Sequence, residues 1–575
     1  MTRGTRIGLT VVALVMVSLI GIGFVARRAR QPGPGSVLEV VLDGDISEQS
    51  GPDPVAEVFG SKPLTVRDYV EAILRAAEDK RINGLLLTVK TPSAAGVAKI
   101  QELREAIRRF RESGKWTVAW TETAGEFGPG TGVYYLATAC ETIWIAPPGD
   151  VNLTGLRSEV TFIRGSLDKL KVKPDFDQIG KYKNAMNFYT NKSMTEAHRE
   201  AMEAILDSLY RQIRQGIAEG RGMTDDEVAV AIDKGPYLGS QALEAKLVDR
   251  LGYRDELEDW LKEKNGGRLP FIKTRRYLKG GRYWSRGARM ALIYGVGGVH
   301  RGESRHDPLT GSESMGSDTV AAAIRQARED DSIKAIVFRV DSPGGSYVAS
   351  DIIWREVSLT KGKKPIVVSM SDVAGSGGYF VAMAADRIIA EPGTITASIG
   401  VLAGKLVTRE LWELIGVTSD AVQRGRHATF FSSEQMYTDE ERSIFRSWLE
   451  RIYKDFVGKV AQGRGKSFDD IHTIAQGRIW SGEDALRLGL VDEVGGLATA
   501  VQRAGELAGL DPKLGVKLVE IPAPKTLLQE FLTRDDKVGE TIVALRNRLR
   551  LLIEEGRLTA EPEQVLEMPY VPRVW

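Results

Sequence analysis

The chain has 575 residues, more than one hydrophobic core usually serves, so two to four domains are expected. With 42% hydrophobic and 27% charged residues, the composition excludes a disordered or fibrous protein. The formal net charge of +1 creates no field that would attract nucleic acid, and one cysteine with five histidines forms no structural zinc motif. We therefore expect a globular protein that binds neither nucleic acid nor metal.

The N-terminal residues 1–35 are expected to form a membrane anchor. Residues 7–25 (IGLTVVALVMVSLIGIGFV) carry no charge and are long enough to cross the lipid bilayer as a helix. A cleaved signal peptide is the alternative, but Arg27, Arg28 and Arg30 crowd the position of a cleavage site. The charges on the two sides of the segment are balanced and do not decide its orientation.

A long internal repeat follows. The segment RAAEDKRINGLLLTVKTP from Arg75 resembles RQAREDDSIKAIVFRVDSP from Arg325, and ALEAKLVDRLG later in the first copy resembles ALRLGLVDEVG in the second. The repeat predicts two domains of like fold, residues 36–272 and 290–523. Residues 273–289, rich in Lys and Arg, are expected to be a linker, and residues 524–575 a helical tail.

Within each copy, short apolar runs alternate with helical patterns. Residues 334–340 (KAIVFRV) and 364–369 (KPIVVS) are typical of buried parallel strands, and residues 319–328 and 377–385 have helical spacing. This alternation predicts the α/β class with parallel β-α-β units.

Two glycine-rich turns in the second copy could carry chemistry. DSPGGS (341–346) follows a strand, and AGSGGY (374–379) lies between a strand and a helix, so Ser376 would stand at a helix N-terminus that favours a developing oxyanion. Gly344, Gly345 and Gly377 would let backbone amides approach a substrate carbonyl. The pair of turns suggests acyl transfer, although tight turns without a function are the alternative. The GxSxG elbow is excluded because Ala374 occupies its first glycine position.

The serine needs a base, and the repeat indicates where one lies. Lys183 in GKYKNAM falls on Ala428 of the second copy, whereas Ser376 falls on Thr131 of the first. The glycine pair falls on residues 93–94 (SA). Each copy thus lacks what the other has, so a complete Ser–Lys site can form across a domain boundary, within one chain or between two.

The motifs LTVKTP, GKYKNAM, DSPGGS, AGSGGYF and TASIG, doubled over residues 36–523, resemble bacterial signal peptide peptidase A, or protease IV, in its long two-domain form. The resemblance implies two tandem ClpP/crotonase-like spiral domains and a membrane-anchored Ser/Lys peptidase that degrades signal peptides and other apolar peptides. It implies no cofactor. It also implies a homo-oligomer in the bacterial cytoplasmic (inner) membrane, anchored in the lipid bilayer through residues 7–25, with its catalytic domains on the periplasmic or outer side.

The same resemblance assigns the site residues: Ser376 as nucleophile, Lys183 as general base, Ser398 as the hydroxyl that orients the lysine, and the amides around Gly344, Gly345 and Gly377 as the oxyanion hole. Asn184 departs from the family, which often has serine after the lysine. A free lysine has a pKa of about 10.4, so a catalytic amine must be buried to be neutral at pH 7.

Three alternatives stay open. His427, one residue before the position that matches Lys183, could make a Ser–His hydrolase. A crotonase-like acyl-CoA enzyme would use paired amides without a nucleophilic serine. The duplicated domains could also be a non-catalytic membrane scaffold.

Overall fold

The computed structural model describes residues 32–49, 63–90, 96–307, 312–523 and 566–567. The expected membrane segment, residues 7–25, and all of the tail except Leu566–Glu567 lie outside these ranges. Within the described ranges, no helix combines the length and apolarity that crossing a membrane requires.

The first domain is built on a six-stranded sheet in which every pair of neighbours is parallel. In sheet order the strands are β8 (Arg250–Leu251), β4 (Thr142–Ile145), β3 (Trp116–Thr121), β2 (Ile82–Val89), β1 (Ser36–Leu42) and β9 (Phe271–Lys273). A small pair, β5 (Asp150–Val151) and β7 (Tyr237–Leu238), lies beside it. The helices are α3 (Val66–Glu78), α4 (Val97–Glu112), α5 (Thr131–Ala137), α6 (Arg164–Lys169), α7 (Asn187–Thr190), α8 (Glu196–Arg221), α9 (Asp225–Lys234), α10 (Gly239–Glu244), α11 (Arg254–Lys264) and the short η1 (Asn184–Met186).

The second domain repeats this plan. Its main sheet runs β20 (Ile479–Ser481), β18 (Ile395–Ala397), β16 (Ile366–Gly375), β14 (Ile333–Ser342), β10 (Ala288–Val296) and β22 (Val516–Glu520). In addition, β17 (Arg387–Ala390) pairs with β16, and β21 (Glu493–Val494) pairs with β17. All pairs are parallel except β18 with β20. The helices are α13 (Ser317–Glu329), α14 (Tyr347–Thr360), α15 (Gly377–Ala382), α16 (Arg409–Leu414), α17 (Asp439–Arg464), α18 (Phe468–Ile474), α19 (Gly482–Arg487), α20 (Leu497–Leu507) and η2 (Pro512–Leu514). The predicted α/β class with duplicated parallel units is confirmed.

The duplication extends to individual contacts. Helices α8 and α17 each have 26 residues, and each ends at a glycine in the left-handed conformation, which needs no Cβ. Arg221 near the end of α8 pairs with Asp249 at 2.9 Å, and Arg464 near the end of α17 pairs with Asp492 at 2.6 Å.

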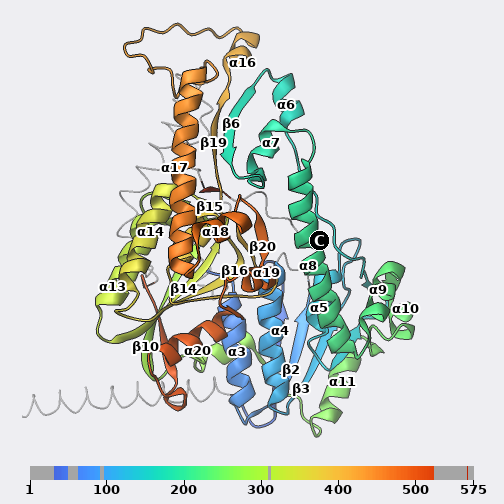
Figure 1. Cartoon of the computed structure of the whole chain (residues 1–575). Coiled ribbons are helices and arrows are strands. Elements are labelled where there is room, and N and C mark those ends of the chain that lie inside the picture. The colour runs from blue at the N-terminus through green and yellow to red at the C-terminus, as the bar shows by residue number, and fades with distance from the viewer. Residues whose placement is uncertain (1–31, 50–62, 91–95, 308–311, 524–565, 568–575) are drawn as a thin grey trace, which may run out of the picture.

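The two domains share one hydrophobic core. A single cluster of buried side chains includes Ile73 of α3 and Leu103 of α4 together with Val337, Val367 and Val501 of the second domain. In Figure 1, α3 and α4 lie beside α20, between the two sheets. The two domains therefore pack against each other and are not separate units joined only by a linker.

An antiparallel ribbon joins the domains a second time. β6 (Lys173–Ile179) of the first pairs along its whole length with β19 (Val401–Val407) of the second. Figure 1 shows this ribbon rising with the upper parts of α8 and α17 away from the two sheets. β6 ends at the lower end of the ribbon (Figure 1), so the residues that follow it lie close to the second domain.

The segment expected to be a linker, residues 273–289, packs against the first domain instead of forming a solvated connection. It holds the end of β9, the helix α12 (Thr274–Lys279) and the start of β10. Tyr277 is completely buried, and its hydroxyl donates to Asp79 at 3.0 Å. The basic side chains of this segment also pair with acidic ones of the first domain, since Arg282 contacts both Asp68 and Glu71.

Candidate active site

Ser376 lies between the end of β16 and the start of α15, completely buried. Its backbone has φ 53° and ψ −112°, a conformation that residues with a Cβ rarely adopt. The amide of Ser376 donates to the carbonyl of Ala397 at 2.7 Å, which fixes the turn. Such strain is retained where surrounding structure over-determines it, often at functional sites.

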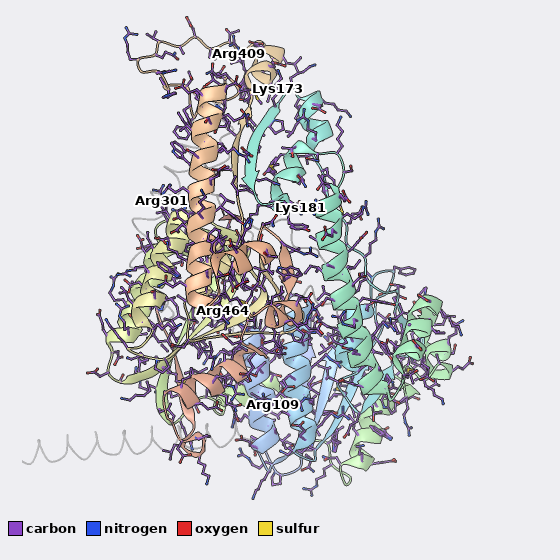
Figure 2. The ribbon with its side chains drawn as sticks, in the orientation of Figure 1. Arg109, Lys173, Lys181, Arg301, Arg409 and Arg464 are labelled. Carbon is purple, nitrogen blue, oxygen red and sulfur yellow. The ribbon has the colours of Figure 1, made fainter. Side chains whose placement is uncertain are left out.

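Lys183 reaches this serine from the other domain. It follows β6 and precedes η1, and its side chain is completely buried. Its Nζ lies 2.7 Å from Ser376 Oγ and 3.1 Å from both the hydroxyl and the carbonyl oxygen of Ser398. The structure thus brings these three predicted residues together within a single chain. Figure 2 shows the nearby Lys181 at the lower end of β6, between α8 and α17.

Unusual backbone conformations concentrate around this contact. Of the seven non-glycine residues with positive φ in the described ranges, four are Ser376, Ala397, Ser398 and Gln476. The carbonyl of Gln476 accepts a hydrogen bond of 2.8 Å from Tyr182, directly before the lysine. The loop of residues 475–478 therefore holds the lysine-bearing turn.

Gly477 in this loop presses directly against the lysine backbone. It has a φ of +80°, and a Cβ built on it would lie 2.5 Å from the amide nitrogen of Lys183. A Cβ on Gly180 would likewise meet the backbone of Gln476 at 2.5 Å. The sequence prediction missed Gln476 and Gly477, because QGR signals only a turn and nothing in it points to Lys183.

The three predicted glycines lie close to Ser376. Gly377 opens α15, where first-turn amides lack acceptors within the helix, and its ideal Cβ would lie 3.1 Å from the amide nitrogen of Gly345. The amide of Gly344 donates to Ser342 Oγ at 3.2 Å. In this state the amide of Gly344 thus already has an acceptor.

Gly344–Gly345 form the short strand β15, which lies in a five-stranded sheet ordered β12 (Arg305–His306), β13 (Glu313–Gly316), β11 (Gly298–His300), β15 and β23 (Leu566–Glu567). β23, from the C-terminal part of the chain, pairs antiparallel with β15. The glycine strand can therefore pair with an extended peptide segment.

Two other residues from the sequence analysis have different surroundings. His427 lies in the connection between α16 and α17, and its Nε2 is 3.9 Å from Glu440, in the first turn of α17. It has no place in the Ser376 contact described above. Asn184 is buried, and its side-chain oxygen accepts from Asn187 at 3.4 Å, so it supports the turn after the lysine.

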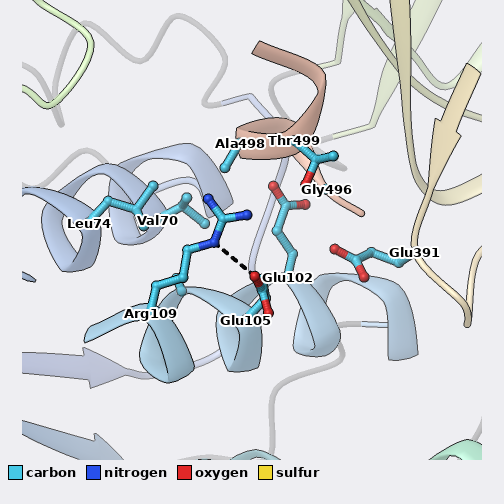
Figure 3. Close-up of a pocket in the computed structure, with 10 residues that line it drawn as sticks. Val70, Leu74, Glu102, Glu105, Arg109, Glu391, Gly496, Ala498 and Thr499 are labelled. Atoms are coloured by element: carbon cyan, nitrogen blue, oxygen red, sulfur yellow. Dashed lines mark hydrogen bonds and ion pairs between the residues drawn. The ribbon is translucent and has the colours of Figure 1, made fainter. Parts of the chain in front are cut away.

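A small pocket elsewhere lies where α3, α4 and α20 meet (Figure 3). Its wall contains Glu102, Glu105 and Glu391 but neither Ser376 nor Lys183. Burial and the nearby carboxyls of Glu102 and Glu105 raise the pKa of Glu391 well above its usual range. The pocket belongs to the domain interface and not to the candidate site.

Comparison with known proteins gives a family. The model of peptidase family S49 matches residues 109–267 and 358–511, one match in each copy of the repeat. The chain is 33% identical to "Serine protease SPPA, chloroplastic" of Arabidopsis thaliana over 91% of this chain and 76% of that protein. It is 34% identical to "Protease 4" of Salmonella typhi over 77% of this chain and 72% of that protein. A solved mutant ClpP1 of Listeria monocytogenes matches 36% of this chain and 94% of its own at 14% identity, with a TM-score of 0.24 that is too low to support an argument.

Proposed function

Because the chain belongs to peptidase family S49 and is a serine peptidase, we propose that Ser376 and Lys183 form its catalytic dyad. The observation that carries the proposal is the 2.7 Å contact between Lys183 Nζ and Ser376 Oγ, made by two fully buried side chains from different domains. A crotonase-like acyl-CoA enzyme would leave this amine–hydroxyl pair unexplained.

In the proposed reaction, Ser376 Oγ attacks the carbonyl carbon of the scissile peptide bond while its proton passes to Lys183 Nζ. The oxyanion that forms is stabilised by the backbone amides around Gly344, Gly345 and Gly377, of which that of Gly344 donates to Ser342 Oγ before substrate binds. Lys183 then protonates the leaving amine as the C–N bond breaks, which gives an acyl-enzyme.

The same amine completes the turnover. Neutral Lys183 accepts a proton from the attacking water, the ester bond of the acyl-enzyme breaks, and the proton returns to Ser376 Oγ. A lysine can play both parts only if it is neutral before attack, and complete burial disfavours its ammonium form. Ser398, which accepts from Nζ at 3.1 Å, holds the amine in line with the serine.

The proposed substrates are extended peptides, including cleaved signal peptides. The antiparallel pairing of β23 with β15 supports this, because a substrate strand could use the same backbone edge. A relative from Enterococcus faecium, 31% identical over 32% of this chain, is named "Putative signal peptide peptidase SppA".

We also propose the finer features expected from the sequence: ClpP/crotonase-like spiral domains, a membrane anchor in residues 7–25, a homo-oligomer, and catalytic domains outside the cytoplasmic membrane. Carbonate extraction of membranes, protease protection of intact cells and light scattering of the purified protein test the last three features separately. Release of the chain by carbonate would contradict the anchor.

The test of the dyad is covalent labelling by a fluorophosphonate probe together with hydrolysis of a synthetic signal peptide. Wild type should label and cleave, whereas Ser376→Ala and Lys183→Met should do neither. Cleavage retained in Ser376→Ala would overturn the proposal in favour of a mechanism without a nucleophilic serine, and His427→Ala should remain fully active.

A further inference from the structure

The strand that leads to Ser376 is bulged just before the serine. Val340 of β14 pairs with Met370 of β16, but the next pair along is Ser342 with Ala374. Residues 371–373 of β16 therefore face a single residue of β14, Asp341. This bulge sets where β16 delivers the serine, because only Gly375 separates Ala374 from Ser376.

Asp341 connects the bulge to the glycine strand. Its Oδ1 accepts from the amide of Val373 at 3.1 Å, while its carbonyl accepts from Gly297 at 2.9 Å. Asp341 precedes Gly344 by three residues. One residue, through its carboxylate and its backbone carbonyl, thus links the approach to the nucleophile with the segment that leads to the proposed oxyanion hole.

The first domain holds this assembly through the N-terminus of α4. The amides of Gly96 and Lys99 each donate to the carboxylate of Asp372, at the bulge, at 3.0 Å. Lys99 Nζ lies 3.2 Å from the same carboxylate and 2.8 Å from Asp341 Oδ2. A helix N-terminus and an ammonium therefore act on both acidic residues of the bulge.

Lys99 is only 9% exposed, yet it is charged. Burial would lower the pKa of Lys99, but Asp341, Asp372 and Glu48 outweigh it and raise this pKa above the usual range. Glu313 of β13 is a further carboxyl near Lys99. Glu48 is bound by Arg339 at 2.8 Å, so the ammonium is needed chiefly by the two aspartates.

We propose that Lys99 is a positioning residue of the peptidase: acting through Asp341 and Asp372, it sets the geometry between Ser376 and the glycine strand. The inference rests on the proposed Ser/Lys function. The first domain would then supply two lysines of opposite kind, a neutral base at position 183 and a permanent cation at position 99.

The test uses the full chain and measures the rate of fluorophosphonate labelling, kcat and KM. Lys99→Met should slow labelling and kcat about 30- to 100-fold, because displacements near 1 Å have such effects, while KM changes less than about threefold. Lys99→Arg keeps the charge and should recover the rate to within about fivefold of wild type.

A pH profile separates positioning from general support of the fold. Even beside Lys99, burial together with Asp372 and Glu48 raises the pKa of Asp341 to about 6. In Lys99→Met the ammonium is gone, so Asp341 gains its charge beside Asp372 and Glu48 as the pH rises from 6 to 9, and their repulsion opens the bulge. The labelling rate of Lys99→Met relative to wild type should therefore fall across this range, and the requirement for a neutral Lys183 cancels in the ratio.

Lys115→Met is the matched control. Lys115 is another first-domain lysine whose Nζ donates to two carbonyls, those of Ala76 and Asp79, at 2.6 and 2.8 Å. It contacts neither turn of the site, so this variant should lose stability while labelling at the wild-type rate.

Should Lys99→Met not fold, Asp372→Asn addresses the same question, because it removes the charge that faces Lys99 and keeps an acceptor oxygen for one of the two α4 amides. About a tenfold slower labelling is expected. Wild-type labelling by folded Lys99→Met or Asp372→Asn would overturn the inference and leave the dyad intact. Labelling of Ser376→Ala would overturn the dyad itself.

Discussion

The two copies share a backbone turn but use it differently. Lys183 donates its amide to the carbonyl of Gly180 at 3.2 Å, and the matching Ala428 donates to Gly425 at 3.4 Å. Both glycines have positive φ. The first turn lies where the two domains meet, with its lysine fully buried, whereas the second lies in the connection between α16 and α17 and is exposed.

The serine turn diverges in the opposite sense. Ser376 has a strained backbone, and its hydroxyl oxygen lies 2.7 Å from the Lys183 amine nitrogen. The hydroxyl of its counterpart Thr131 donates to the carbonyl of Gly155 at 3.0 Å, so it serves the fold. Duplication therefore preserved the scaffold in both copies and divided the reactive groups between them.

The strongest way to break this comparison is to remove either reactive group. Ser376→Ala and Lys183→Met should each lower kcat/KM by about 10⁴-fold or more, with little loss of folding. An equimolar mixture of the two variants should remain inactive, because the pair forms within one chain. Recovery of peptide hydrolysis in the mixture would show that the pair is made between subunits.

A second test asks whether the exposed turn can replace the buried one. Ala428→Lys in a Lys183→Ala background should stay below about 1% of wild-type activity, because an exposed lysine remains protonated and has no serine beside it. Hydrolysis of a signal peptide measures the outcome. Substantial activity in this double variant would mean that a lysine in this turn can act as the base without being buried.

A third test sharpens the role of the loop that supports Lys183. Gly477→Ala should reduce kcat about 10- to 100-fold, since its Cβ would collide with the lysine backbone at 2.5 Å. Gly465→Ala is the control: its φ is also positive, at +62°, but a Cβ there meets nothing within 4 Å. It should lose about 1 kcal/mol of stability and keep its kcat. Equal kinetic effects would refute a specific role for Gly477.

The smallest expected effect concerns the pH dependence of stability near the glycine strand. Burial, with Glu48 and Asp341 nearby, raises the pKa of Glu313 to about 7 from an ordinary value of 4.5. Between pH 4.5 and pH 7, Glu313 is ionised in the unfolded chain but still protonated in the folded one. The free energy of unfolding therefore falls as the pH rises through this range, by up to about 3 kcal/mol. Glu313→Gln should remove this loss, as urea unfolding at pH 5 and pH 8 would reveal. An unchanged difference between the two pH values would exclude Glu313 as its source.

Much of the active site could be predicted from the sequence because its parts lie in local motifs. The run KAIVFRV specifies a buried strand, SGG specifies a turn into a helix, and the comparison of copies paired Lys183 with Ser376. Lys99 and Gly477 could not be found this way, since their importance comes from contacts across the domain boundary. Tyr277 was missed for a related reason: its basic neighbours suggested solvent, while its ring fills the first domain's core.

The division of the proposed dyad between the domains also has a consequence during synthesis. Lys183 leaves the ribosome 193 residues before Ser376 does, and the second sheet is complete only when β22 has joined β10. A nascent or truncated chain that lacks the second domain therefore cannot form the proposed Ser–Lys pair. Peptide hydrolysis is expected to begin only after both domains have been synthesised and have packed together.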